Sequence, residues 1–316
     1  MRKSGMVALI VAGSLVVIGV ALLSVGLILR GEFVNSNMTT NTYEIVEDFR
    51  DVSIVGSTAK IRIAVADDGV CRVESYENPG KEQYLPSVKD GVLTVERVDY
   101  RRWYMHMFDF GKTPSLTVYL PAEQWGSLSV RVSTGDVQIA SGLFFEEIAV
   151  KGSTADVTCQ ASAAETLKID LSTGDIEMQG NSAKNAELTV TTGQIEVEGF
   201  ACTDLYVKVS TGDTELTDVV CKTFTSTGST GDLELEGVMA EDYSIERSTG
   251  DVTFERCDAK KLWIKTDTGS VSGTLLSDMI FYAKSDTGKI RVPKSTTGGS
   301  CEITTDTGDV RISVRQ

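Results

Sequence analysis

Carboxylates recur at one position of a repeating pattern, and these are the residues of the chain whose type and spacing could do chemistry. Seven Asp residues directly follow a small residue at the same place in the repeat: Asp136, Asp156, Asp175, Asp213, Asp232, Asp251 and Asp309. In two further repeats a Ser or a Lys takes that place, and Asp267 or Asp286 precedes it by three residues. Oxygen ligands of this kind suit Ca²⁺, and paired carboxylates serve as acid and base in polysaccharide-cleaving enzymes.

A structural role explains these Asp residues more simply, because each can accept backbone N–H bonds at its own turn. Stacked charges about 4.8 Å apart repel by about 0.9 kcal/mol in water, so amide bonds or counter-ions must offset that cost. The nonapeptide signature of calcium-binding rolls is absent from the sequence. We predict no catalytic, cofactor-binding or metal-binding residue and no cofactor, with a row of weak calcium sites as the alternative.

The Asp positions belong to a repeat that runs through most of the chain. A Thr precedes the small residue of every repeat, and the small residues are Gly135, Ala155, Gly174, Gly193, Gly212, Gly231, Gly250, Gly269, Gly288 and Gly308. Seven of the nine intervals are 19 residues long and two are 20. A period this constant is typical of one structural unit stacked on copies of itself.

Each repeat contains two short strands with one buried face. Apolar residues stand two and mostly four positions after the small residue, and seven and mostly five positions before it. The chain is therefore predicted to be all-β, a single-stranded parallel β-solenoid (β-helix) of about ten 19-residue coils. Ten coils spaced by about 4.8 Å make a rod roughly 45 Å long.

The corner sequence Ser-Thr-Gly-Asp is typical of a tight turn with positive φ at Gly. Ala155 breaks this pattern, and with the same backbone it would cost on the order of 1 kcal/mol. Residues 52–63 fit the template too, with an eleventh corner at Ala59.

The first 30 residues are a different kind of chain. An uncharged apolar stretch from Met6 to Leu29 lies between Arg2 and Lys3 on one side and Arg30 on the other, and it is long enough to span a bilayer. A cleaved signal peptide has a shorter apolar centre and a small-x-small cleavage site, so we favour a retained anchor. The flanking charges place the N-terminus in the cytoplasm and the solenoid on the outer side of the cell membrane.

The expected organisation has four parts. Residues 1–30 form a cytoplasmic tip and one transmembrane helix, 31–42 a tether, 43–127 irregular N-terminal coils with a capping role, and 128–316 the regular β-solenoid. The aromatic insertion at 100–110, which carries the only His of the chain (His106), is either a plug over the open end of the core or a contact surface. At the other end, outward Arg311 and Arg315 are expected to discourage end-to-end pairing of rods.

The net charge of the chain limits which partners it can bind. The first 30 residues hold three of the 30 basic residues and none of the 45 acidic ones, so the remainder has a net charge of −18. Nucleic acid and anionic lipid are poor partners for such a surface, whereas cations or basic polymers are attracted.

Cys202 and Cys221 share a repeat position. We interpret them as buried free thiols, with a disulfide as the alternative.

The STGD repeat, the single anchor, the RRWY segment and the SLTVYLP strand (115–121) together resemble the bacterial putative-adhesin family, a domain of unknown function found in many Gram-positive envelope proteins. The resemblance covers roughly residues 45–316. It implies a surface β-solenoid, in some relatives associated with envelope stress, and it carries over no functional residue.

The sequence thus favours a non-enzymatic, membrane-anchored extracytoplasmic rod that acts as a surface adhesin, a scaffold or an envelope-stress sensor. Its expected partners are the membrane, through residues 6–29, and an envelope protein or glycan, but not nucleic acid. A polysaccharide-active enzyme is the alternative, although its groove needs walls that near-constant intervals do not supply.

Overall fold

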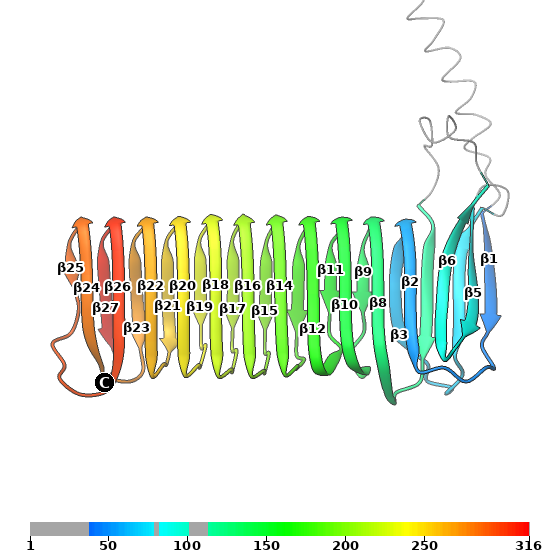
Figure 1. Ribbon diagram of the computed structural model, residues 1–316, viewed down its shortest axis with the longest axis horizontal. Helices are drawn as coiled ribbons and strands as arrows, with labels where there is room; N and C mark the ends of the chain where they lie inside the picture. Colours follow the sequence, from blue (N-terminus) through cyan, green and yellow to red (C-terminus); the bar gives the residue numbers. More distant parts are fainter. Residues whose placement is uncertain (1–37, 79–81, 101–112, 316) are drawn as a thin grey trace, which may run out of the picture.

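The molecule is a straight rod built from two long, mainly parallel β-sheets (Figure 1). The computed structural model describes residues 38–78, 82–100 and 113–315. These residues contain strands and no helix, so within them there is no helix that could span a membrane. The segment 6–29 lies outside the described residues.

One sheet, called here the short-strand sheet, has 14 strands. In spatial order they are β1 (Thr39–Glu44), β4 (Arg72–Glu77), β7 (Ser115–Leu120), β3 (Lys60–Val65), β9 (Val137–Ile139), β11 (Val157–Cys159), β13 (Ile176–Gln179), β15 (Ile195–Glu198), β17 (Thr214–Thr217), β19 (Leu233–Glu236), β21 (Val252–Cys257), β23 (Val271–Leu275), β27 (Val310–Val314) and β25 (Ile290–Arg291).

The other, called the long-strand sheet, has 13 strands. In spatial order they are β5 (Glu82–Lys89), β6 (Val92–Asp99), β2 (Asp51–Thr58), β8 (Gln124–Thr134), β10 (Phe144–Thr154), β12 (Ser162–Thr173), β14 (Asn185–Thr192), β16 (Asp204–Thr211), β18 (Thr223–Thr230), β20 (Asp242–Thr249), β22 (Lys261–Thr268), β26 (Gly299–Thr307) and β24 (Met279–Thr287).

Each coil runs through a long strand, turns at the corner Gly, continues through a short strand and returns along a third side. Equivalent residues of neighbouring coils pair in parallel register, as Thr173 with Thr192 and Thr192 with Thr211. On the third side single bridges link Ala201 to Ser182 and to Val220. The predicted parallel β-solenoid of about ten coils is confirmed.

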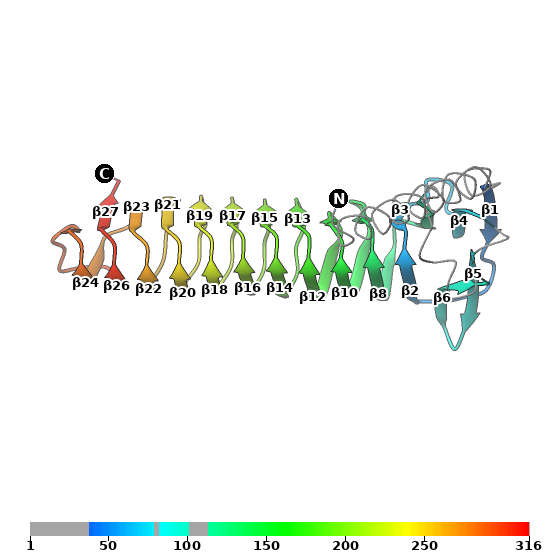
Figure 2. The same cartoon turned by 90° about the horizontal axis from the view of Figure 1, so that it is seen from above.

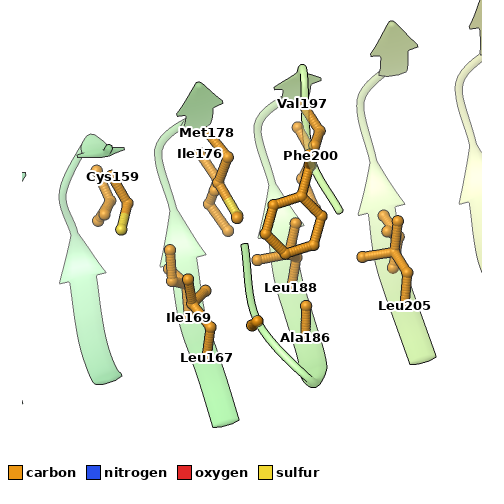
Figure 3. Packing of buried hydrophobic residues seen from close by; sticks show 14 of the residues in the cluster. Cys159, Leu167, Ile169, Ile176, Met178, Ala186, Leu188, Val197, Phe200 and Leu205 are labelled. Carbon is orange, nitrogen blue, oxygen red and sulfur yellow. The ribbon is translucent and has the colours of Figure 1, made fainter. Parts of the chain in front are cut away.

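Alternation along the strands explains the core. Side chains that point inward from both sheets and from the third side are almost fully buried, among them Leu188, Val197 and Phe200. Figure 3 shows how these apolar columns stack from coil to coil. Because every coil buries its apolar residues against the coils beside it, the core is one continuous column along the rod.

The N-terminal end is closed by strands that leave the solenoid pattern. The first coil, β2 with β3, stacks on β8 with β9, and the predicted corner at Ala59 is confirmed because Gly135 lies directly beside it. The second coil, β6 with β7, lies outside the first. Antiparallel β5 then covers the edge of β6, and antiparallel β4 and β1 cover that of β7. These strands cap the described N-terminal end.

At the C-terminal end the last coil is inserted rather than added. Strand β26 lies between β22 and β24, and β27 lies between β23 and β25 (Figure 1). The outermost coil is therefore β24 with β25, and Arg311 does not lie on an edge strand, contrary to expectation. Its strand, β27, is covered on both sides.

Two glycines allow this insertion. A Cβ at Gly298 would lie 1.8 Å from the backbone oxygen of Asp278, and one at Gly299 would lie 2.2 Å from that of Lys260. Pro293, which has no N–H to donate, follows the short β25, so the chain leaves the ladder there. The chain then enters the gap between two coils where only glycine fits.

Candidate functional site: the corner ladder and the acidic face

Glycine is needed at the corners for two reasons. The turn has a positive φ there, and the backbones of neighbouring coils approach each other closely. Gly212 and Gly231 have φ of +133° and +131°, a region that L side chains rarely adopt. A Cβ at Gly231 would also lie 2.0 Å from the backbone oxygen of Gly212. Ala155 does not share the positive φ, so the strain expected there is absent. Positive φ is confirmed at five other corners and is absent at Gly269 and Gly288, where the prediction is wrong; the five are Gly135, Gly174, Gly193, Gly250 and Gly308.

The corner carboxylates bond the next coil instead of their own turn, which corrects the prediction. Oδ1 of Asp232 accepts the backbone N–H of Asp251 at 2.8 Å, and Oδ1 of Asp251 accepts that of Ser270 at 2.7 Å. The same bond joins Asp156 to Asp175 at 3.0 Å. These hydrogen bonds form a ladder between coils, which offsets the repulsion of the stacked charges.

The ladder follows the spatial order of the coils. Oγ of Ser270 accepts the N–H of Asp309 at 3.3 Å, and Oδ1 of Asp309 accepts that of Lys289 at 2.8 Å. Ser270 thus replaces the carboxylate as acceptor where the repeat loses its Asp. The sequence period alone predicts neither the direction of these bonds nor the jump from Ser270 to Asp309.

A second row of carboxylates lies on the outer face of the short-strand sheet. Glu177, Glu196, Glu215 and Glu234 occupy consecutive coils in register, and all four are exposed. Beside them stand Glu198, Glu236 and Glu255. We call this surface the acidic face. Seven carboxylates are therefore gathered on one side of the rod.

The geometry does not build a metal site from these residues. Within 38–78, 82–100 and 113–315, no three His, Cys, Asp or Glu side chains gather closely enough to hold an ion. A hollow of about 170 Å³ between neighbouring coils is lined by five carboxylates, those of Glu196, Asp213, Glu215, Asp232 and Glu234.

Larger hollows lie along the third side of the rod. One, of about 660 Å³, is lined by residues of several coils, among them Ala122, Lys184 and the exposed Phe144. Another, of about 440 Å³, is lined by residues that include Val220 and Gly299. Small side chains such as Ala163 and Ala240 line them. The second hollow includes Glu241, whose pKa is lowered mainly by its hydrogen bond with Lys260.

One charged residue that the sequence pattern did not single out is buried in the core. Arg247 is 1% exposed and occupies a column that is otherwise apolar or small. Its Nη2 donates to Ser226 at 2.9 Å and to Thr214 at 3.4 Å, while Nε and Nη1 have no protein partner among the described residues. Burial lowers the pKa of Arg247 to about 10, although the carboxylates of Asp213 and Asp232 act against this.

Gly228 makes room for this guanidinium, since a Cβ there would lie 1.6 Å from Nη1 of Arg247. The signal in the sequence is a Gly exactly one period before an Arg at an inward position.

The other predicted sites have mixed outcomes. The aromatic insertion, including His106, lies outside the described residues except for Tyr100, which is 56% exposed. Cys202 and Cys221 are free thiols in adjacent coils, as interpreted, and a hydrogen bond between them together with burial raises the pKa of Cys202. Cys221 is buried and Cys202 is partly exposed.

A capped parallel β-solenoid with a hydrogen-bonded corner ladder, and with polar columns on its outer faces, defines the class of protein. The family model described as Toastrack DUF4097 matches residues 49–218 and 201–316, and the chain belongs to this family. No curated protein matches the chain.

Three solved structures are similar to this chain over most of their own length. A putative adhesin from Bacteroides fragilis is 16% identical with a TM-score of 0.44, and the match covers 88% of this chain and 98% of that one. A putative adhesin from Parabacteroides merdae is 11% identical with a TM-score of 0.42, covering 89% and 98%. A putative lipid binding protein from Parabacteroides distasonis is 12% identical with a TM-score of 0.46, covering 88% and 98%.

Proposed function

We propose that this protein is a non-enzymatic, membrane-anchored rod on the outer side of the cell membrane that presents repeated polar surfaces to components of the envelope. The observation that carries the proposal is the in-register display of like side chains on a rigid scaffold, as in the acidic face. Repeated weak contacts add up when one polymer engages several of them at once. An adhesin or a scaffold needs this property, whereas an enzyme needs one walled pocket.

The position of the first described strand supports the orientation of the rod. Strand β1 begins at Thr39 in the capped end (Figure 1). Because residues 6–29 precede this strand in the sequence, an anchor there would be joined to that end. The coil of β24 and β25, which no described strand covers on its outer side, then lies at the end away from the bilayer. Distal placement of an open end suits a rod that reaches toward a partner. Envelope-stress sensing through the same surface is a further part of this proposal.

Fractionation and surface labelling of whole cells test the anchored topology. A tag placed after Gln316 should be accessible to an impermeant reagent and should sediment with membranes, and deletion of 6–29 should release the rod. A tag that is protected in intact cells, or a soluble intact chain, would contradict the proposed location.

Capture of envelope components by the full chain tests the binding role. Enrichment of a defined envelope protein or glycan, weakened when the acidic face or another outer column is neutralised, supports the proposal. Steady turnover of uronic-acid or neutral glycans that is abolished by a single Asp substitution would instead establish the enzyme alternative.

A further inference from the structure

Two exposed aromatic side chains near the distal end share a column on the outer face of the long-strand sheet. Trp263 in β22 is 37% exposed and Tyr282 in β24 is 65% exposed. Glu302 in β26 lies between them, because its register partners are Trp263 on one side and Tyr282 on the other. Figure 2 shows β22, β26 and β24 side by side in that order.

Insertion of the last coil sets the spacing of the two rings. Trp263 and Tyr282 are one repeat apart in the sequence, and stacking in sequence order would put them in adjacent coils. With Glu302 between them they are instead two coils apart, roughly 9.6 Å along the rod. The two aromatic rings are therefore separated by one exposed carboxylate.

The three side chains are free to bind a ligand. None of them forms a side-chain hydrogen bond or ion pair with a described residue. The next row toward the corner contains Lys265, Thr304 and Lys284, again in register. These lysines keep only exposed contacts, Lys265 to Glu246 at 3.8 Å and Lys284 to Asp286 at 2.9 Å.

This pattern matches the chemistry of an extended sugar chain. A pyranose ring has an apolar C–H face that stacks on an aromatic ring, and its edge carries hydroxyls that bond carboxylates and ammonium groups. In an extended β-1,4-linked chain each sugar advances by nearly one coil spacing, and alternate rings have the same orientation. Rings two coils apart with a hydrogen-bond acceptor between them therefore fit such a chain laid along the rod.

A protein partner fits less well. A stable protein interface buries a contiguous area of about 1,000 Å² or more, with charged residues depleted at its centre. Here a carboxylate lies at the centre and the aromatic surface is limited to two separated rings.

We propose that the column Trp263–Glu302–Tyr282 binds an extended β-1,4-linked glycan, with alternate sugars stacked on the two rings and the intervening sugar hydrogen-bonded to Glu302. This inference rests on the proposed function and deepens it, since it gives the chemical class of a ligand for the rod.

Calorimetric titration of the full chain in detergent with chitohexaose, a β-1,4-linked hexamer, tests the proposal, with the α-1,4-linked maltohexaose as the comparison. Saturable binding of chitohexaose only is expected. Trp263→Ala and Tyr282→Ala should each weaken it at least tenfold, and Trp263→Phe should retain most of it. Tyr206→Ala is the matched control, because Tyr206 lies in the same column three coils from Trp263 and should leave the affinity unchanged.

The spacing itself can be tested with the double variant Trp263→Ser and Ser244→Trp. It keeps two aromatic rings and Glu302 but places the rings three coils apart, so binding should not be restored. Absence of chitohexaose binding, equal binding of maltohexaose, or wild-type affinity in the alanine variants with unchanged melting temperatures would each overturn the inference. Membrane sedimentation and surface labelling do not depend on this column, so the two proposals can fail separately.

Discussion

The coils in the middle of the rod and those at its two ends follow the same repeat but differ in how they are ordered. From β8 to β23 each coil stacks on the one that precedes it in the sequence. At the N-terminal end the second coil, β6 with β7, lies outside the first, and at the C-terminal end the last coil lies inside the one before it. The ends also differ from each other, because antiparallel strands cover only the N-terminal one among the described residues.

This difference shows that the sequence repeat determines which residues of two stacked coils pair with each other. It does not determine the order in which the coils stack along the rod. Coils that are not consecutive in the sequence pair through the same repeat positions as consecutive ones, as β2 does with β8 and β22 with β26. Local features therefore decide the order of the coils. Examples are the glycine pair at Gly298 and Gly299 and the strands β4 to β7, which lie between β3 and β8 in the sequence. The reordered C-terminal end also creates the spacing of the aromatic column.

The largest expected effect is in the middle of the rod, at a corner. Gly231→Ala should cost about 3 kcal/mol of unfolding free energy, because it combines strained backbone with a clash against the oxygen of Gly212. Gly180→Ala is the matched control: φ is also positive there, at +63°, but a Cβ meets nothing within 4 Å. It should cost about 1 kcal/mol. Equal losses in urea denaturation would show that stacking does not require the corner glycine.

The next effect is confined to the reordered end. Gly298→Ala should cost about 2–3 kcal/mol locally, because the added Cβ would meet the backbone oxygen of Asp278 where φ is +100°. Hydrogen exchange should accelerate in β24 to β27 and stay slow in β12 to β18. Uniform acceleration along the whole rod would mean that the end is not a separate unit.

A smaller effect is expected at the one charged residue inside the regular coils. Gly228→Ala should destabilise the protein by about 1–2 kcal/mol because its Cβ collides with Arg247. In an Arg247→Ala background the same change should be neutral or stabilising, since it fills space that the guanidinium has left. The double-mutant cycle should therefore give a coupling of about 1 kcal/mol or more. Additive losses would contradict the packing described here.

The smallest effect concerns the corner ladder. Asp232→Ala should cost about 1 kcal/mol through the lost bond to the N–H of Asp251, and Asp232→Asn less, because its amide oxygen still accepts. Asp267→Ala, at an exposed carboxylate with no side-chain bond to a described residue, should be nearly neutral.

Millimolar calcium and EDTA should leave the melting temperature of the protein nearly equal. A rise of many degrees with calcium would establish the metal-binding alternative.

Much of the coil was predictable from the sequence. Spacing and alternation predict both strands, the inward residues such as Ile176 and Leu188, and the positive φ of most corner glycines. The period relates Trp263 to Tyr282 but does not say which coils are neighbours, so the aromatic column was not predictable. The period also does not say which backbone N–H donates a hydrogen bond to each corner carboxylate. In the structure the carboxylate of Asp232 accepts one from Asp251 in the next coil. Arg247 was missed because an apolar pattern predicts burial only for apolar residues.

Cross-linking tests the reordered stacking most directly. In the structure Lys265 and Thr304 are register neighbours, whereas Lys265 and Lys284 lie two coils apart. The pair Lys265→Cys with Thr304→Cys should form a disulfide under added oxidant, because neighbouring strands place Cα atoms about 4.8 Å apart and both positions lie on the outer face, unlike the buried Cys221. The pair Lys265→Cys with Lys284→Cys should remain reduced. Efficient bridging of 265 to 284, with none to 304, would show that the coils stack in sequence order and would contradict the account.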